Sequence, residues 1–295
     1  MDFKEELLNK TEFVNNVLRE YYPKEDGYQK IIFEAMNYSV EAGGKRLRPI
    51  FMMEVSKLFE GFNDEIKPFM AALEMIHTYS LVHDDLPAMD NDDYRRGMLT
   101  THKKYGHAMG VLCGDALLNF AFETVADALC NSKDMVASAR AMQVLAKKAG
   151  AYGMIGGQVV DVDLSGNGAT KEQLDFIYEN KTSALIEAAF MIGAILSGAT
   201  DEQINLVEKA AWNIGMAFQI QDDILDVIGD ASVIGKPVLS DEKNEKTTYV
   251  SLYGIDGAKT YVETYTKEAI DILSNIGKEN SFLNDLIISL INREK

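Results

Sequence analysis

The sequence of 295 residues is poor in several residue types, and each shortage excludes a class of protein. Two cysteines are too few for a disulfide framework, which excludes small stapled scaffolds. Lysine and arginine number 29 against 46 acidic residues, and the net charge of −17 argues against nucleic acid and anionic membranes as partners. No uncharged apolar run approaches the roughly 20 residues needed to span a bilayer. We therefore expect a cytoplasmic protein without stable membrane insertion.

Proline is also rare, with five residues, while 47% of the chain is apolar, so the composition allows a large helical core. Apolar residues recur at three- and four-residue spacing, and clean alternation is almost absent. No Pro- or Ser-rich linker interrupts this pattern, so we expect residues 1–295 to form a single all-α domain. Two apolar stripes, over 7–18 and 31–40, predict the first two helices. Further predicted helices lie near 50–60, 65–86, 108–130, 134–155, 171–180, 182–198, 202–228, 258–276 and 280–292.

Local signals refine this helix map. Thr170 and Gln173 have the spacing of a capping box, and a further helix is expected to start near Asp201. The segment 182–198 is apolar almost all round, which predicts a central position in a bundle. Cys113 and Cys130 lie in apolar helical segments and are expected to be buried free thiols.

Two aspartate clusters, each at the end of an apolar stretch, are the most informative feature of the chain. The first contains Asp84, Asp85 and Asp90, and the second contains Asp222, Asp223 and Asp226. Carboxylates packed this closely repel one another and need a cation, and hard oxygen ligands are typical of Mg²⁺ sites. A solvated acidic helix end is the alternative for one cluster, but two clusters favour metal ions that grip a diphosphate from both sides.

Spacing distinguishes the aspartates within each cluster. Asp222 and Asp226 are four residues apart and share one helix face, while Asp223 is rotated by roughly 100° and is a weaker ligand candidate. Asp84 and Asp90 are six residues apart and would diverge on a regular helix. Pro87 disturbs the helix between them, which could bring Asp90 back toward Asp84.

The cations are clustered as well. The turn Gly43-Gly44-Lys45-Arg46-Leu47-Arg48-Pro49 gathers three positive groups, which suits phosphate binding, although an ordinary basic loop is the alternative. Arg95-Arg96, Lys181-Thr182 and Lys236 are individually weaker candidates. Gly156-Gly157 inside a helical pattern indicates close helix packing or a kink. His77 lies about two turns before the first aspartates, and could equally be a structural histidine.

This combination of motifs, with Phe218-Gln219-x-Gln221-Asp222-Asp223 as the second cluster, closely resembles the short-chain trans-prenyltransferases over about residues 40–250. Within that family the resemblance is first to bacterial farnesyl diphosphate synthases, and geranylgeranyl diphosphate synthases are similar. The resemblance implies an isoprenoid-synthase-type bundle of about ten or more helices around a central cavity, usually as a homodimer. It also implies head-to-tail condensation of isopentenyl diphosphate with an allylic diphosphate.

The resemblance further implies roles for single residues. Up to three Mg²⁺ ions are expected on the aspartates, with Asp85, Asp223 and Asp226 in supporting positions. Basic residues at the carboxyl end often help to close the site, but Glu294 between Arg293 and Lys295 puts that role in doubt. The allylic substrate is assigned to Arg95, Lys181, Thr182, Gln219 and Lys236, the first four of them as catalytic residues, and isopentenyl diphosphate to Lys45, Arg48, His77 and Arg96.

The expected reaction needs no protein nucleophile. Mg²⁺ and fixed cations stabilise the leaving diphosphate, an allylic carbocation forms, the alkene of isopentenyl diphosphate attacks it, and a proton is lost. Tyr79 and Ser80 precede Asp84 by five and four residues, about one helical turn. In related enzymes a bulky residue at this place goes with the fifteen-carbon product, so Tyr79 predicts farnesyl diphosphate.

Three alternatives remain in view. A geranylgeranyl diphosphate synthase is the serious one. A terpene cyclase usually carries Asn, Ser/Thr and Glu in its second metal motif, where this chain has Asp222, Asp223 and Asp226. A non-catalytic subunit of a heteromeric synthase tends to lose metal ligands, and none is lost here.

Overall fold

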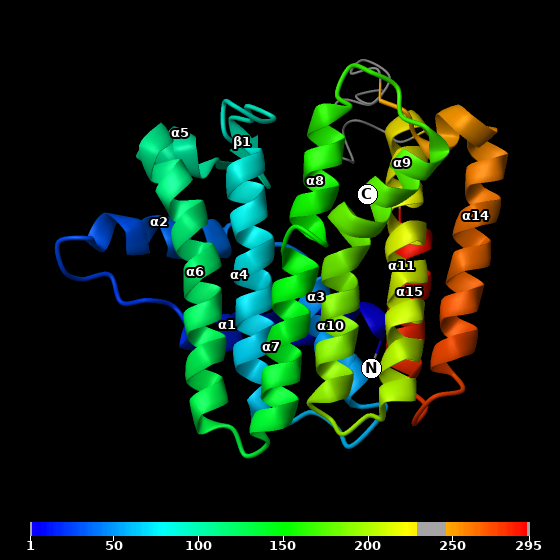
Figure 1. Ribbon diagram of the computed structural model, residues 1–295, viewed down its shortest axis with the longest axis horizontal. Helices are drawn as coiled ribbons and strands as arrows, with labels where there is room; N and C mark the ends of the chain where they lie inside the picture. The colour runs from blue at the N-terminus through cyan, green and yellow to red at the C-terminus, as the bar shows by residue number, and fades with distance from the viewer. Residues whose placement is uncertain (1, 229–245, 294–295) are drawn as a thin grey trace. The chain divides into compact units, whose positions relative to one another are not determined.

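The computed structural model describes residues 2–228 and 246–293, which are almost entirely helical (Figure 1). The described residues divide into two units. Unit 1 comprises Met1–Met53 and Phe62–Met142, and unit 2 comprises Glu54–Gly61 and Gln143–Lys295. The prediction of an all-α fold is confirmed for the described residues, and the single domain over 1–295 stays a prediction.

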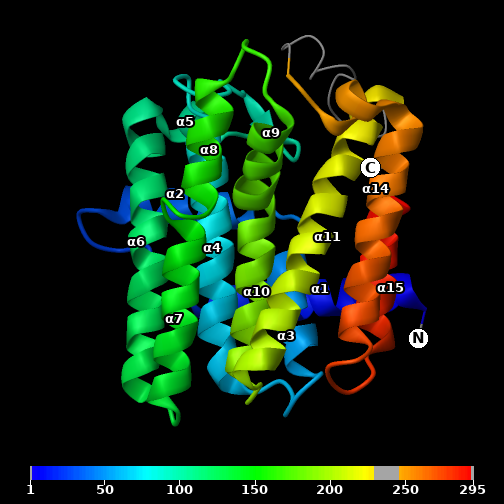
Figure 2. The ribbon, with the colours of Figure 1, turned by 45° about the vertical axis from the view of Figure 1, so that its right-hand side comes forward.

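Unit 1 is built around α4 and α6, which lie side by side in both views (Figure 1, Figure 2). α4 is apolar on nearly every side, and 13 of its residues are buried. Such a helix is stable only when neighbours cover it all round. The elements that begin in this unit are α1 (Phe3–Glu20), α2 (Lys30–Glu41), α3 (Leu47–Ser56), η1 (Asp64–Ile66), α4 (Lys67–Asp84), β1 (Tyr94–Arg95), β2 (Met98–Leu99), α5 (Thr101–Tyr105), α6 (His107–Asn131) and α7 (Met135–Ala149).

Unit 2 places α10 and α11 at its centre, with α14 packed along α11 (Figure 2). Eleven residues of α10 are buried, which confirms the central position predicted for 182–198. The unit contains α8 (Met154–Asp163), α9 (Lys171–Ile177), the π-helical segment η2 (Tyr178–Ser183), α10 (Ala184–Ile195), α11 (Asp201–Ile228), α14 (Tyr249–Leu273) and α15 (Ser281–Ile291).

Capping signals fix several helix ends. The predicted capping box of Thr170 and Gln173 is present at the start of α9. α11 begins at Asp201, as expected, and its cap is Thr200, whose amide donates to Gln203 Oε1 at 2.9 Å. The helix predicted over 134–155 is wrong at its end: the chain leaves the helix after Ala149, within a segment that contains glycines at 150 and 153, and resumes at Met154. α14 starts at Tyr249, nine residues earlier than predicted, behind a capping box at Thr248, and a kink at Gly254 separates this first part from the rest of the helix.

Two helical features bear on membranes and thiols. α6 is the one described helix that is long and apolar enough to cross a bilayer by length and composition, but it carries Asp115, Glu123 and Asp127 and packs against α4. Buried core helices of other proteins have the same length and apolar composition, so these properties alone do not indicate a membrane span. Cys113 of α6 is buried as predicted, whereas Cys130 near the end of the same helix is exposed, which corrects the expectation of two buried thiols. Cys130 falls on the outer side of the last turn, where unit 1 does not cover it.

The two thiols should therefore differ sharply in reactivity. Burial raises the pKa of Cys113 to about 11, so its thiolate is scarce at pH 8. We expect Ellman's reagent at pH 8 to label Cys130 in the native protein and both cysteines in guanidinium chloride. The variant Cys130→Ser is the control, because it should remove native labelling. Rapid labelling of native C130S would contradict the buried position of Cys113.

Candidate active site

The first aspartate motif lies where α4 ends. Asp84 is the last residue of the helix, and Pro87 stands exposed in the turn that follows. The backbone then returns, because the amide of Asp90 donates to the carbonyl oxygen of Asp84 at 2.8 Å. This return agrees with the effect expected of Pro87. It places the backbones of the outer two aspartates next to each other, despite a separation of six residues.

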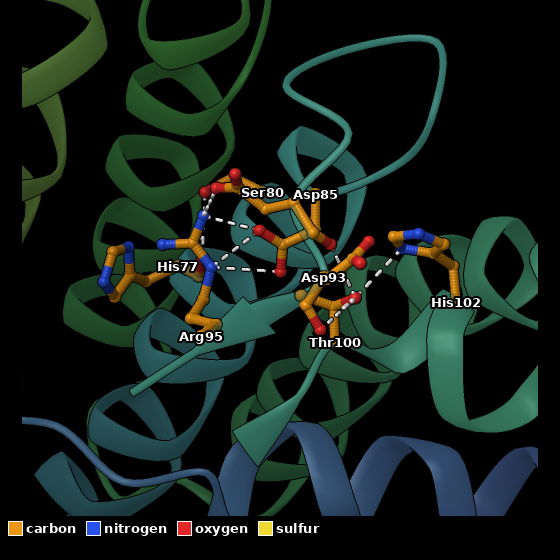
Figure 3. Close-up of polar contacts among 8 residues, drawn as sticks. His77, Ser80, Asp85, Asp93, Arg95, Thr100 and His102 are labelled. Carbon is orange, nitrogen blue, oxygen red and sulfur yellow. Dashed lines mark hydrogen bonds and ion pairs between the residues drawn. The ribbon is translucent and has the colours of Figure 1, made fainter. Parts of the chain in front are cut away.

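Asp85, by contrast, is turned inward and held by Arg95 (Figure 3). The Arg95 guanidinium donates through Nη2 at 2.6 Å and through Nε at 2.8 Å to Asp85 Oδ1. Burial raises the pKa of Asp85 although Arg95 opposes the shift, because the carboxyl is only 3% exposed. The fork connects the β1–β2 hairpin to the end of α4. Asp85 thus has a protein partner, which suits the assisting role expected for it.

The glycine pair of the basic turn allows close contact with the same hairpin. Gly43 and Gly44 have φ values of +86° and +138°, a region that favours glycine. The guanidinium of Arg96 donates to the carbonyl oxygen of Gly43. A Cβ atom on Gly44 would lie 2.6 Å from Arg96 Nη1, so no other residue fits there without displacing the arginine. Arg96 is therefore stacked on the turn that carries Lys45 and Arg48.

The predicted cations of unit 1 share one electrostatic environment. Burial lowers the pKa of Arg48 to about 10, with Glu74 opposing and Arg96 adding to the shift. Burial, followed by the charges of Arg48 and Arg96, lowers the pKa of His77 well below its usual value. His77 is therefore neutral at pH 7, and it can offer a hydrogen bond but no charge. The arginines remain protonated.

The two residues assigned to chain length lie on α4 and are buried. Tyr79 is 4% exposed, and its hydroxyl has no hydrogen-bond partner among the described residues. Burial, and then the charge of Asp84, raise the pKa of Tyr79 to about 12, so the phenol stays neutral. Its ring packs edge-on against His83, with 5.9 Å between centroids. The Ser80 hydroxyl donates to the carbonyl oxygen of His77 at 2.9 Å and is turned to its own helix.

In the second motif, α11 separates the three aspartates as the spacing predicts. Asp222 and Asp226 are half-buried, whereas Asp223 is 3% exposed on another side of the helix. Asp223 Oδ2 accepts from the Tyr178 hydroxyl at 2.6 Å and from the amide of Tyr249 at 3.0 Å. Asp223 thus joins η2 and the start of α14 to the motif.

Arg293, beyond the end of α15, contacts this motif directly. Its Nη2 atom lies 2.5 Å from Asp222 Oδ1 and donates to the carbonyl oxygen of Phe218 at 2.9 Å. The guanidinium carbon lies 3.7 Å from the centre of the Phe218 ring. A cation from the chain itself therefore balances Asp222.

A cavity of about 130 Å³ in unit 2 gathers most of the remaining predicted residues. Lys181, Thr182 and Gln219 line it, and Thr182 donates to Gln219 Oε1 at 2.8 Å. Lys181 Nζ lies 2.5 Å from Asp161 Oδ2, and Lys246 Nζ lies 3.7 Å from Asp161 Oδ1. The cavity therefore brings two ammonium groups to the carboxylate of Asp161, beside the hydroxyl of Thr182 and the amide of Gln219, and Asp223 lines it as well.

Glycine packing sets the position of Lys181. A Cβ atom on Gly157 would lie 2.3 Å from the amide nitrogen of Lys181, so only glycine lets α8 approach η2 this closely. Close packing was the structural explanation expected for this glycine pair. The approach brings Asp161 of α8 within reach of Lys181. Burial by itself would raise the pKa of Asp161, but Lys181, and after it Lys246, overcome that effect and lower it.

The donor set fits Mg²⁺ bound together with a phosphate ligand. No three His, Cys, Asp or Glu side chains in the described part of the chain converge on one point. Mg²⁺ is usually held by one or two carboxylates, water and substrate phosphates, so a three-residue cage is not required. The half-buried Asp222 already accepts a cationic partner in Arg293, which shows that its position tolerates positive charge.

Comparison with known proteins identifies the family. The model of the polyprenyl synthetase family matches residues 29–281. The chain belongs to the polyprenyl synthetase family. Among curated relatives, the farnesyl diphosphate synthase of Micrococcus luteus is 40% identical over 99% of both chains. The chloroplastic geranylgeranyl pyrophosphate synthase of Catharanthus roseus is 43% identical over 95% of this chain and 78% of its own.

Solved structures agree with this assignment. A geranyltransferase from Helicobacter pylori, determined with magnesium and isoprenyl diphosphate, superposes with a TM-score of 0.83 at 31% identity, covering 99% of this chain and 97% of that one. The fold is therefore that of the isoprenyl diphosphate synthases, and this polyprenyl synthetase is a trans-prenyltransferase.

Several residues of the site were not predicted from the sequence. Lys246 and Asp161 line the cavity, and Tyr178 anchors Asp223. Lys246 lies two residues before Thr248, the cap of α14, and only its contact with Asp161 reveals it. Lys236 was predicted to bind substrate and lies outside the described residues.

The Asp161–Lys181 pair predicts a pH-dependent stability. The folded-state pKa of Asp161 is depressed, so its contribution is full above the unfolded value of about 4 and is lost as the pH falls through the lower folded value. We expect Asp161→Asn to lower the free energy of unfolding by about 1 kcal/mol at pH 7 in urea titrations. The difference in the free energy of unfolding between D161N and the wild type should become smaller below about pH 4.

The control is Asp163→Asn, an exposed position on the same helix, which should stay within about 0.5 kcal/mol of the wild type. A gap of the same size for D161N at pH 7 and pH 3 would contradict the ion-pair account.

Proposed function

We propose that this chain condenses isopentenyl diphosphate with dimethylallyl and then geranyl diphosphate to give farnesyl diphosphate. The observation that carries the proposal is the grouping of cationic side chains within each of the two units. Unit 1 places Arg48 and Arg96 beside a neutral His77, and unit 2 places Lys181 and Lys246 in one cavity. Both arrangements suit diphosphates, and each unit carries one aspartate motif.

The proposed roles follow the charges. Lys45, Arg48, His77 and Arg96 bind the diphosphate of isopentenyl diphosphate, and His77 contributes a neutral donor. Arg95, Lys181, Thr182 and Gln219 bind the allylic diphosphate, and we add Lys246 to this set because it shares the cavity and the Asp161 contact with Lys181.

The aspartates are proposed to bind Mg²⁺, through Asp84 and Asp90 in the first motif and Asp222 in the second, with Asp226 on the same face. Asp85 and Asp223 support them from buried positions, each through hydrogen bonds to its neighbours. When bound, Mg²⁺ neutralises charge on the diphosphate and makes it a better leaving group. The number of ions, up to three, is part of the proposal.

In the proposed reaction the C–O bond of the allylic diphosphate breaks, and diphosphate leaves with the electron pair. The ammonium groups of Lys181 and Lys246 stabilise the negative charge that develops on it. The alkene of isopentenyl diphosphate then forms the new C–C bond, and a proton passes to a base, for which the released diphosphate suffices. Thr182 and Gln219 orient the leaving group through their mutual hydrogen bond.

Product length is proposed to depend on Tyr79. Its buried ring lies about one turn before Asp84 and packs against His83, so it is held firmly enough to stop a growing chain. Geranylgeranyl diphosphate is the second candidate product, because relatives of similar identity carry both names. We further propose a cytoplasmic homodimer. A cyclase is disfavoured by Asp222, Asp223 and Asp226.

The metal assignment predicts a loss of turnover without a loss of fold. Asp84→Ala and Asp222→Ala should each reduce product formation from isopentenyl and geranyl diphosphates by at least about a hundredfold, because each removes charge stabilisation of the leaving group. Asp127→Ala, an exposed aspartate of α6, is the control and should leave turnover unchanged. Near-normal activity of both variants, or activity that survives EDTA in the wild type, would reject the assignment.

The proposed role of Tyr79 in stopping the growing chain predicts that its replacement changes the length of the product rather than the rate. Tyr79→Ala should shift the main product from fifteen to twenty or more carbons, as measured by chromatography of the dephosphorylated alcohols. Tyr79→Phe keeps the ring and should keep the fifteen-carbon product. A twenty-carbon product of the wild type, or an unchanged distribution in Y79A, would remove Tyr79 from this role.

A further inference from the structure

Arg46 stands in the basic turn between Lys45 and Arg48, yet it faces the interior of unit 1. Its side chain is 3% exposed and forms an ion pair with Glu74, which is 2% exposed. Nη1 lies 2.7 Å from Glu74 Oε1, Nη2 donates to the carbonyl oxygen of Val40 at 2.6 Å, and Nε donates to Asn15 Oδ1 at 3.0 Å. One guanidinium thus connects α1, α2 and α4.

The backbone of Arg46 is strained in a way that this contact explains. Its φ is +49°, a left-handed conformation that costs a non-glycine residue roughly 1–2 kcal/mol. Its carbonyl oxygen accepts from Ile50 at 3.1 Å, so Arg46 also starts α3. A residue keeps such a conformation only where its surroundings fix it. Here the three hydrogen bonds of its own side chain supply that constraint.

The conformation of Arg46 sets the directions of its neighbours. Lys45 precedes it and is exposed, while Arg48 follows in the first turn of α3 with a buried Nε atom that has no hydrogen-bond partner in the described part of the chain. If the turn relaxed at Arg46, both cations would rotate. A buried donor without a protein partner is what a bound anion would satisfy.

Glu74 also acts on the charge of the site. Its carboxylate interacts with Arg48 and Arg96 as well as with Arg46, and its Oε2 atom is buried without a hydrogen-bond partner among the described residues. One carboxylate thus faces several arginines while His77 is neutral. The excess of positive charge suits a multiply charged anion.

We propose that Arg46 and Glu74 form a buried positioning pair, which holds Lys45 and Arg48 in the geometry that binds the diphosphate of the non-allylic substrate. Neither residue touches that substrate. The inference rests on the proposed function, since the substrate is the isopentenyl diphosphate named there. A purely structural pair would support the fold of unit 1 without any preference for one substrate.

Steady-state kinetics with each of the two substrates distinguish a positioning pair from a purely structural pair. Glu74→Gln keeps the shape and removes the charge, and it should raise the KM for isopentenyl diphosphate about tenfold or more. The KM for geranyl diphosphate and kcat should each change less than about threefold. Arg46→Lys keeps the charge but loses the fork, so it should raise the same KM by a smaller factor.

The chain offers a matched control in a largely buried pair of unit 2, Lys148 with Glu187. Glu187→Gln should lower the melting temperature as Glu74→Gln does, with both KM values within about threefold of the wild type. An E74Q variant whose two KM values change together, or not at all, would overturn the positioning role. If E74Q does not fold, an R46K variant with a wild-type KM for isopentenyl diphosphate overturns it.

Calorimetry with isopentenyl diphosphate alone keeps this test independent of turnover. We expect E74Q to bind it about tenfold or more weakly than the wild type. If the wild type forms no prenyl product, the proposed function fails, while the calorimetric comparison still decides the positioning role. Equal dissociation constants for wild type and E74Q would overturn the inference whatever the product assay gives.

Discussion

Charge compensation inside the protein is the constraint on which the structure depends. Acidic residues outnumber basic ones, yet the motifs and their surroundings bring carboxylates into partly buried positions, where an unpaired charge is costly. The protein resolves this by giving these carboxylates cationic partners from other elements of the same unit. The pairs are Asp85 with Arg95, Asp161 with Lys181, Asp222 with Arg293 and Glu74 with Arg46.

Under the proposed function, three of these pairs have a second duty. Arg95, Lys181 and Arg293 lie at residues assigned to substrate or metal, so a phosphate or a metal ion can exchange with a partner that is already charged. Such an exchange replaces one electrostatic contact by another, and it avoids a buried charge without a partner. The Arg46–Glu74 pair differs, because Arg46 also donates to Asn15 and to the carbonyl oxygen of Val40, and no exchange is needed for binding.

The sequence was sufficient for the fold class, the motifs and the helix faces, because these depend on local spacing. The separation of Asp222 and Asp226 from Asp223 follows from helical periodicity, and the cap at Thr170 from a four-residue pattern. Contacts between distant segments were beyond such reasoning. Nothing in the local sequence distinguishes Arg46, whose side chain is held by Glu74, Asn15 and Val40, from Arg48.

The π-helical segment η2 has a consequence for the way this chain can vary. Its wider turns mean that α9 and α10 belong to one continuous rod but do not share a common helical phase. The buried faces of α9 and α10 therefore do not follow one helical repeat, and apolar residues are required at positions that are set separately for each helix. Loss of a single residue in this segment would convert the π turn to a regular α-helical turn and leave the later side chains of the rod facing the same way. Loss of a residue from α10 itself would instead rotate the side chains that follow it by about 100°. Length variation within the rod should thus be tolerated only in η2.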